Sequence, residues 1–594
     1  MTFSCLFQRE KSPSSNTPLP KKRTQNHLAK WKRTHSHGVP RTTTQPTEGD
    51  VAADPTPLNP PPLSLREPVP FPIPHPNLAA ASYPALSAHQ HGSPYQSDGL
   101  SGPRAPTAPS SSRPVAAATG GGGSRRASCS SGADAALCDD LLQEVFRLLP
   151  PASAPAVSLV SRRWLALLRS ATSSLALRLP ASSSDGAAAA TLAALLSRYP
   201  YLAALTVVCA AVPADAVLLA VASAPAAARL SSLRFLPDSA VSTAALLAAC
   251  PALSGLTSLH LTAVRPLSFR WLAFLPRLKS FALVNSAATV DSAASSSDDA
   301  DADGEAASPL PLERLSLCGI RSGDRGLGWL WRRCGSLKWL QLRACDGTGD
   351  SPASVAFAGC LAGLLALELR ACRPVADRVL LLAADHCRAL TSLLVYDGGS
   401  SEALHRFIHQ RSAGLHTLDL RLPLDLHNDH LLAIGAEQIH RGEDATCSLA
   451  ALRLQSCVLI TGDGLRSLAR TAIGASIEEL ALVSCDVVER EPGLLTFLCQ
   501  SMQRLRRLDL SYNETLNDKV IGAMLSSCRN LVDIRLRGCR GLTGGSLTSL
   551  LRHCGQSLQI LDISRCPGIA VEDLRAIAQR KGMMVGPKAG EEPF

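Results

Sequence analysis

The 594-residue sequence predicts an α/β protein built mainly from a solenoid of short strand-and-helix repeats. Three observations predict this fold. A leucine pattern recurs at near-constant spacing from residue 202 onward, a non-repeating segment before it has helical apolar periodicity, and residues 1–133 consist largely of Pro, Ser, Thr and Ala. We therefore expect a disordered arm at 1–133, a helical unit at 134–179, about fourteen repeats at 180–582 and a tail at 583–594.

The N-terminal arm is predicted to be disordered, because such a composition cannot bury enough apolar area to offset the entropy of ordering the chain. Within it, KKRTQNHLAKWKR (Lys21 to Arg33) is compatible with a bipartite nuclear localisation signal. A solvated basic patch is an alternative, and so is an organellar transit peptide, since Glu10 is the one acid in the first 47 residues. The expected location is the nucleus, the cytoplasm or both.

The formal charge of +10 resides mainly in this arm, where 14 basic and 6 acidic residues give +8. The folded part is therefore nearly neutral, which argues against nucleic acid as a partner of the repeats. No uncharged apolar run reaches the roughly 18 residues of a membrane span. The start of the chain lacks the apolar core of a secretory signal, so we expect a reducing compartment and free thiols for the 19 cysteines.

The non-repeating segment, LCDDLLQEVFRLLPPASAPAVSLVSRRWLALLRS, spans residues 137–170. Acids at Asp139 and Asp140 suit a helix N-terminus, and Pro150 ends that helix. Two or three short helices cannot form an independent core of useful size. We therefore expect that the segment LALRL (175–179) and a second protein cover their apolar surface. The residues expected on one apolar side of the first helix are Leu141, Leu142, Val145, Leu148 and Leu149.

The repeats share the pattern L-x-x-L-x-L, mostly at spacings of 25 to 28 residues, the range of leucine-rich repeats. Alternation sends the leucines at positions four and six to one face of a short strand, where stacking on the next unit buries them. A helix follows each strand, and we expect strands on the concave side of a horseshoe. The fourteen units begin at Leu202, Leu230, Leu256, Leu278, Leu312, Leu337, Leu364, Leu390, Leu415, Leu449, Ile477, Leu505, Leu531 and Leu558.

The ninth position of the unit lies where the chain turns from strand to helix. We interpret its occupants as a structural ladder, because no C-x2-C occurs and zinc is poorly supported. His405 and His409 in HRFIH lack an evident third ligand, so we expect neither metal nor cofactor. Residues 287–308 and 422–448 should form loops. The ladder residues are Cys345, Cys372, Cys457, Cys485, Asn513 and Cys539.

Positions three, five and seven should face the concave side. We hypothesise that they bind an acidic or phosphorylated target through arginines, with two aromatic residues as anchors. The alternative is a solvated face whose arginines pair with Glu368 and Asp419. The predicted target-binding residues are Trp339, Arg343, Arg370, Tyr396, Arg421, Arg453, Arg535 and Arg537.

The non-repeating segment resembles an F-box. The residues that carry the resemblance are Leu137, Asp140, Leu141, Leu142, Val145, Phe146, Leu149, Leu159, Val160, Arg162, Arg163 and Trp164, while Cys138 stands where the family normally has Pro. The repeats resemble the cysteine-containing leucine-rich repeats that follow the F-box in plant F-box/LRR proteins. Together the resemblance covers residues 137 to about 580.

The resemblance implies a non-catalytic substrate receptor of an SCF-type (Skp-cullin-F-box) ubiquitin ligase. The F-box would bind a Skp-family adaptor, and through it a cullin and a RING subunit, while the repeats capture a target for ubiquitination. The sequence contains no phosphate-binding loop and no G-x-S-x-G or H-E-x-x-H motif, so no motif in it indicates an enzyme. An alternative is a binding scaffold without a ligase role. The implied adaptor-binding residues are Leu137, Leu141, Leu142, Val145, Leu149, Pro150, Leu159, Val160 and Trp164.

Overall fold

The structure is a computed structural model, and it describes residues 137–179, 185–209, 213–236, 240–265, 268–289, 308–324, 326–349, 351–423, 425–436, 449–491, 493–528, 530–570 and 584–585. The predicted disordered arm, its basic cluster, most of the acidic insert and much of the 422–448 connection lie outside these residues. Among the described helices, none combines the length and apolar character needed to cross a membrane.

The segment before the repeats folds into short helices, as predicted. Its first helix has two acids in the first turn, and Ser161 caps the last helix by accepting a hydrogen bond from the Trp164 amide at 3.1 Å. Arg163 joins the two ends of the unit, because its guanidinium donates to Asp139 and to the Leu137 carbonyl. The elements are α2 (Asp139–Leu148), η1 (Pro151–Ser153), α3 (Ala154–Ser158) and α4 (Arg162–Ala171).

This helical unit has a small core of its own. Leu142, Phe146, Val157, Leu167 and Ala171 are buried together and form a cluster separate from the core of the repeats. The expectation that the segment 175–179 would cover the helices is wrong, since the leucines of that strand pack against the repeat core instead.

The strands form one parallel sheet in which neighbours follow the order of the chain. The exception is β3, which pairs with β5, and the short strand β4 also pairs with β5. A strand begins two residues after each of the fourteen predicted starts, which confirms the repeat register. The strands are β1 (Ser174–Leu179), β2 (Ala204–Cys209), β3 (Ser232–Phe235), β4 (Ala240–Val241), β5 (Ser258–Arg265), β6 (Ser280–Thr289), β7 (Arg314–Cys318), β8 (Trp339–Arg343), β9 (Ala366–Arg370), β10 (Ser392–Tyr396), β11 (Thr417–Arg421), β12 (Ala451–Gln455), β13 (Glu479–Val483), β14 (Arg507–Asp509), β15 (Asp533–Arg535), β16 (Ile560–Asp562) and β17 (Met584–Val585).

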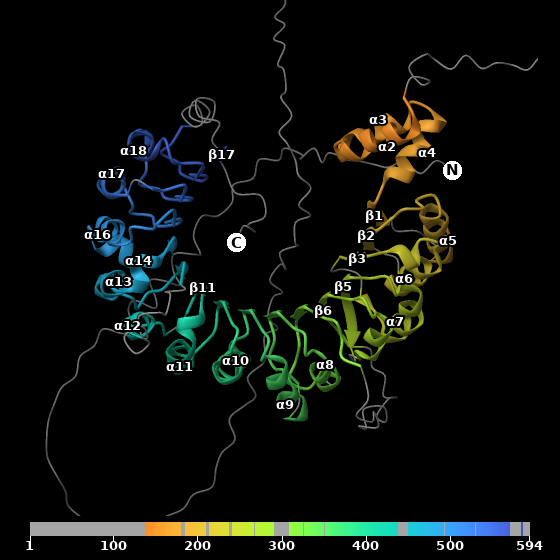
Figure 1. The fold of residues 1–594 in the computed structure, drawn as a ribbon, viewed down its shortest axis with the longest axis horizontal. Helices are drawn as coiled ribbons and strands as arrows, with labels where there is room; N and C mark the ends of the chain where they lie inside the picture. The colour runs from red at the N-terminus through yellow and green to blue at the C-terminus, as the bar shows by residue number, and fades with distance from the viewer. Residues whose placement is uncertain are drawn as a thin grey trace, which may run out of the picture. The chain divides into compact units, whose positions relative to one another are not determined.

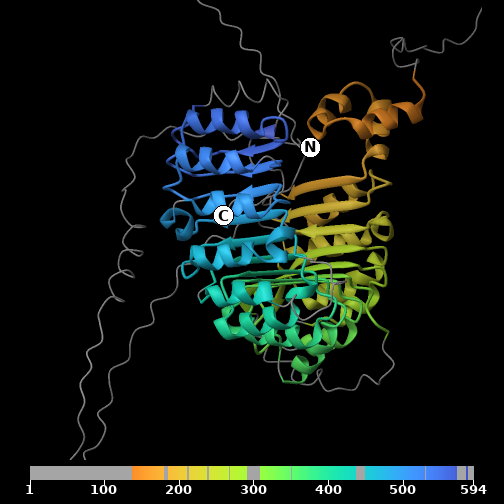
Figure 2. The ribbon, with the colours of Figure 1, turned by 60° about the vertical axis from the view of Figure 1, so that its left-hand side comes forward.

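Helices and 3-10 turns return the chain from each strand to the next. Strands line the inner side of the repeat array and helices its outer side (Figure 1), and the strands stack as successive rungs (Figure 2). They are α5 (Asp185–Leu196), α6 (Ala214–Ser223), η2 (Ala227–Arg229), α7 (Thr243–Ala249), η3 (Cys250–Leu253), η4 (Arg270–Phe274), α8 (Leu327–Arg333), α9 (Ser351–Cys360), α10 (Arg373–His386), α11 (Ser401–Arg411), η5 (Ser412–Gly414), α12 (Asn428–Ala436), α13 (Gly462–Ala469), α14 (Ala472–Ser476), α15 (Asp486–Arg490), α16 (Leu494–Ser501), α17 (Asp518–Ser527) and α18 (Gly544–Cys554).

The turn after each strand has a repeated backbone conformation. Eight non-glycine residues have φ between 48° and 62°, and all eight occupy the eighth position of their repeat unit, directly after the strand. Gly319 and Gly538, at φ 76° and 70°, fill the same position. Left-handed backbone is uncommon outside glycine, so the surrounding contacts must hold these turns. The eight are Ala344, Ala371, Asp397, Leu422, Ser456, Ser484, Tyr512 and Arg565.

The ninth position supplies those contacts. The Cys372 thiol donates to the Leu342 carbonyl of the preceding repeat at 3.3 Å, and Cys566 donates to Leu536 at 3.0 Å. Asn513 does the same with its amide, 2.8 Å from the Leu482 carbonyl. Burial also raises the pKa of the Cys539 thiol to about 12. The ladder interpretation is confirmed, because these side chains satisfy main-chain carbonyls of the neighbouring repeat.

Candidate functional site

Helix α2 has two apolar faces. Leu142 and Phe146 point into the core of the helical unit. Leu141, Val145 and Leu148, spaced by four and then three residues, form a neighbouring stripe roughly 100° further round the helix, where Leu141 is 56% and Leu148 is 78% exposed. A helix that buries one apolar stripe normally presents polar residues on the other, so this second stripe is available for a partner.

The turn after α3 extends the exposed apolar surface. Leu159 is 85% exposed, and Val160 and Leu137 are exposed too. We call Leu137, Leu141, Val145, Leu148, Leu159 and Val160 the outer apolar face. Burial of each leucine-sized side chain is worth roughly 1.5–3 kcal/mol, so covering this face would contribute a large share of a binding free energy.

The adaptor-binding residues implied by the sequence do not all lie on this face. Leu142 is only 3% exposed and is a core residue. Trp164 is half-buried, with its ring centroid 5.3 Å from that of Phe146, and Leu149 packs against the same core. Leu141, Leu142, Val145, Leu148 and Leu149 share one side of the helix, as the sequence suggested, but only part of that side is buried. Leu142 and Leu149 pack into the core, whereas Leu141, Val145 and Leu148 are exposed. Leu148 belongs to the exposed stripe but not to the implied adaptor-binding residues, and its seven-residue spacing from Leu141 is the sequence signal that indicates it.

The inner face of the sheet carries the residues predicted to contact a target. Strand register places Arg343, Arg370, Tyr396 and Arg421 opposite one another on consecutive strands β8 to β11, as the spacing predicted. Neighbouring strands lie roughly 4.8 Å apart, so these four side chains form a continuous row.

Most arginines of the predicted set are paired with carboxylates. Arg421 makes two hydrogen bonds to Asp419, at 2.9 and 2.7 Å, and Arg370 contacts Glu368 at 3.0 Å. These pairs match the alternative prediction from the sequence, in which the arginines of the inner face pair with Glu368 and Asp419. The remaining pairs are Arg453 with Asp509 at 3.1 Å and Arg535 with Asp533 at 3.2 Å.

Glu368 lies at the centre of a hydrogen-bonded group. Besides Arg370, its carboxylate accepts from the Trp339 indole at 3.2 Å and from the Gln341 amide at 2.8 Å. The Arg314 guanidinium lies over the Trp339 ring, 5.8 Å from the centroid. Trp339 therefore belongs to a polar network rather than standing as a separate apolar anchor.

Arg343 and Arg537 differ from the other four arginines. Within the described residues, no carboxylate forms an ion pair with either guanidinium. They are the members of the predicted set with charge available for an acidic partner.

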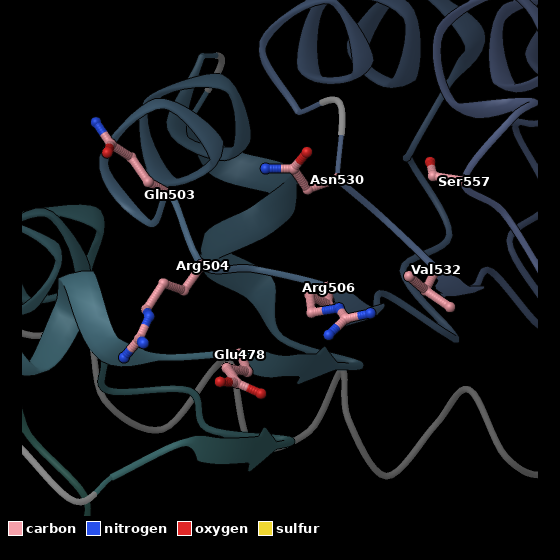
Figure 3. A pocket seen from close by; sticks show the side chains of 7 residues that line it. All are labelled: Glu478, Gln503, Arg504, Arg506, Asn530, Val532 and Ser557. Atoms are coloured by element: carbon pink, nitrogen blue, oxygen red, sulfur yellow. The ribbon is translucent and has the colours of Figure 1, made fainter.

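Two hollows lie away from these surfaces. One, of about 480 Å³, opens at the N-terminal edge of the strands. Figure 3 shows Glu478 between Arg504 and Arg506 in this hollow. Because the carboxylate separates the two cations, the hollow offers no concentrated positive charge. We assign it no ligand.

The other hollow, of about 500 Å³, contains His405 and His430. His430 is fully buried, with Nε2 2.9 Å from the Ser401 carbonyl and Nδ1 accepting from the His427 amide at 3.1 Å. It therefore joins α11 to α12. Across the described ranges, no three His, Cys, Asp or Glu side chains are placed to hold a metal ion.

Comparison with known proteins identifies the helical unit. The family model described as F-box domain matches residues 136–173, so this part of the chain is an F-box domain.

The chain is also similar to several solved structures. A chain in the Rad7 and Elc1 complex from yeast is 16% identical over 75% of this chain and 92% of its own length, with a TM-score of 0.42. An internalin (inlF) from Listeria monocytogenes is 11% identical over 75% and 94%, with a TM-score of 0.26. The leucine-rich repeat-containing protein LegL7 from Legionella pneumophila is 14% identical over 64% and 98%, with a TM-score of 0.31.

The chain thus combines an F-box domain with a leucine-rich-repeat solenoid of parallel strands and outer helices.

Proposed function

We propose that this chain is the substrate-recognition subunit of an SCF-type ubiquitin ligase. The observation that carries the proposal is the outer apolar face of the F-box domain, which stays exposed although the domain has a formed core. A Skp-family adaptor would cover this face and connect the chain to a cullin and a RING subunit. The repeats would hold a target protein for ubiquitination and degradation.

In this proposal the chain supplies position and no chemistry. Tethering a target to the ligase raises the effective concentration of target lysines near the ubiquitin-conjugating enzyme. The cost of ordering is small where the F-box domain is already folded before it meets the adaptor.

Co-purification tests the adaptor. The full chain, expressed with a Skp-family adaptor, should co-elute in gel filtration, and the double variant Leu141→Arg/Leu148→Arg should elute alone. Leu247→Arg on α7 is the matched control, because it places the same charge on an exposed leucine of a repeat. Circular dichroism should be the same for all three proteins. If the double variant still co-elutes with the adaptor, the proposal is contradicted, and the alternative of a binding scaffold without a ligase role is favoured.

For the target we propose that an acidic or phosphorylated segment contacts Arg343 and Arg537, the two arginines of the predicted target-binding set for which the described residues show no ion pair. A phosphopeptide array probed with the full chain should lose its signal in Arg343→Glu/Arg537→Glu. Arg507→Glu is the control, since Arg507 already contacts Glu479 at 2.6 Å. Equal signals from both variants would exclude this mode of recognition.

The cell compartment is a separate proposal. Residues 1–47 fused to a fluorescent protein should concentrate in the nucleus, and alanine at Lys21, Lys22 and Arg23 should abolish this. Accumulation in an organelle instead would favour a transit peptide.

A further inference from the structure

The inner face of the sheet divides into two halves that differ in charge. The inner-face positions of β9 to β16 hold six arginines and six acids, and five ion pairs join ten of these twelve residues. The inner-face positions of β1 to β8, all of which the structure describes, hold four arginines and no acid. We call this second surface the basic half, and its arginines are Arg178, Arg234, Arg314 and Arg343.

The charge of the basic half is not compensated by the part of the chain that the structure describes. No carboxylate there forms an ion pair with any of the four arginines. Asp324, in the turn after β7, is bound by Arg265 at 2.9 Å and by the Asn285 amide at 3.1 Å. Burial, followed by the charge of Arg234, lowers the pKa of His260 to about 4, so this histidine adds no charge near neutral pH. The arginines therefore present a net positive charge to a partner.

Small hydroxyl side chains lie between these arginines. Ser232, Ser258 and Ser280 are in register on β3, β5 and β6, and Arg314 continues their row on β7. The three serines are half-buried and Arg314 is exposed. Hydroxyl and guanidinium groups both donate hydrogen bonds to carboxylate oxygens, and bonds to an ionised acceptor are the stronger ones. The row is thus suited to an anionic ligand that lies close to the sheet.

The width of the basic half gives the length of such a ligand. Strands β1, β2, β3, β5, β6, β7 and β8 pair in this order, so six strand spacings of roughly 4.8 Å separate Arg178 from Arg343, or about 29 Å. An extended peptide rises roughly 3.3 Å per residue, so about nine residues cover this width. Because alternate side chains of an extended peptide share a side, acids at every second position would all face the arginines.

The side chains of the basic half favour a polypeptide over a nucleic acid. The inner-face positions of β1 to β7 hold no Phe, Tyr or Trp, and Arg314 lies over the one ring on β8, that of Trp339, 5.8 Å from its centroid. Surfaces that bind single-stranded nucleic acids combine positive charge with aromatic rings on which bases stack. The basic half has the charge without such rings.

We propose that the basic half binds an extended, carboxylate-rich segment of a target protein, about nine residues long. This inference rests on the proposed function, because it names the feature of the target that this part of the repeats recognises. It extends the contact at Arg343 towards β1 and does not involve Arg537.

Fluorescence anisotropy tests the inference. The probe is a fluorescein-labelled nonapeptide with glutamate at alternate positions, and the full chain is titrated into it. Arg178→Glu/Arg314→Glu should weaken binding at least tenfold, because both arginines are exposed and the reversed charges repel the peptide. Arg234→Gln, which removes one charge without reversing it, should weaken binding about threefold and replaces the double variant if that protein does not fold.

The matched control is Arg507→Glu/Arg540→Glu. It changes the net charge by the same amount at two exposed arginines outside the basic half. This variant should bind the peptide as the wild type does, because long-range charge is equal in the two double variants. Equal loss of affinity in both would overturn the inference.

Salt and the chemistry of the probe give a second measurement. The affinity of the wild type should fall at least tenfold between roughly 50 and 500 mM salt, because exposed charges are screened. The same peptide with glutamine in place of glutamate should show no binding. Comparable binding of the glutamine peptide would overturn the inference, and so would tighter binding of a labelled single-stranded DNA of nine nucleotides.

Adaptor binding separates this inference from the ligase role. Leu141→Arg/Leu148→Arg should bind the glutamate peptide unchanged. If the wild type binds the peptide but does not co-elute with an adaptor, the ligase role alone is refuted. If it co-elutes with the adaptor but does not bind the peptide, this inference alone is refuted.

Discussion

Arg453 extends over Ala481 to reach Asp509 two strands away, with Nη2 and Oδ2 3.1 Å apart. The three residues occupy equivalent positions of β12, β13 and β14, and the small side chain between the charges leaves the path open. Fifty-six residues separate the pair in the sequence. The inner face is thus organised by contacts that skip a repeat as well as by neighbours.

This ion pair should contribute measurably to stability. In a double-mutant cycle with Arg453→Met and Asp509→Asn, urea denaturation should show a coupling of about 1–2 kcal/mol, because both side chains are largely shielded from water. The exposed pair Arg490 and Asp486 should show a coupling below about 0.5 kcal/mol. Equal coupling in the two cycles would contradict the role of burial.

Asn513 should be the most sensitive residue of the ladder. Its amide nitrogen donates to the Leu482 and Leu510 carbonyls, and its oxygen accepts from the Cys485 amide. Asn513→Ala should lower the free energy of unfolding by roughly 2–3 kcal/mol, since these buried groups lose their partner. Asn513→Cys should lose much less, because cysteine serves at the equivalent positions. The exposed Asn530→Ala is the control, and an effect there equal to that at Asn513 would refute the ladder.

Adjacent leucines of α2 should behave oppositely. Leu142→Ala should destabilise the F-box domain by about 2–5 kcal/mol through a cavity in its small core. Leu141→Ala should change its stability by no more than about 0.5 kcal/mol, because that side chain is exposed. Hydrogen exchange of the α2 amides measures both. If the α2 amides are equally protected from hydrogen exchange in the two variants, then Leu142 is not the buried residue of the pair.

His260 should make stability depend on pH. Burial, followed by the positive charge of Arg234 on the neighbouring strand, lowers the pKa of His260 from 6.5 to about 4. Between these values the unfolded chain binds a proton that the folded chain does not, so the free energy of unfolding falls as pH falls from 6.5 to about 4. The loss is up to about 3 kcal/mol. Urea denaturation across this range should show a shallower dependence for His260→Gln, and an unchanged slope would exclude His260 as the cause.

Much of the fold could be predicted from the sequence. The fourteen strand starts follow from leucines at positions four and six, a local pattern that can be satisfied only by stacking one unit on the next. The cysteine and asparagine ladder follows in the same way, since every unit makes the same turn and leaves the same carbonyl to satisfy.

The sites depended on the tertiary structure. Leu141 and Leu142, like Leu148 and Leu149, are adjacent leucines, so periodicity allows either stripe of α2 to be buried, and packing against α4 buries the one with Leu142. The sequence placed the arginines of the inner face in the right rows, yet four of the six predicted target-binding arginines are paired with acids on the same strand or two strands away. Short-range periodicity determined which residues share a face, whereas the reach of long side chains across the assembled sheet decided which of them remain open to a partner.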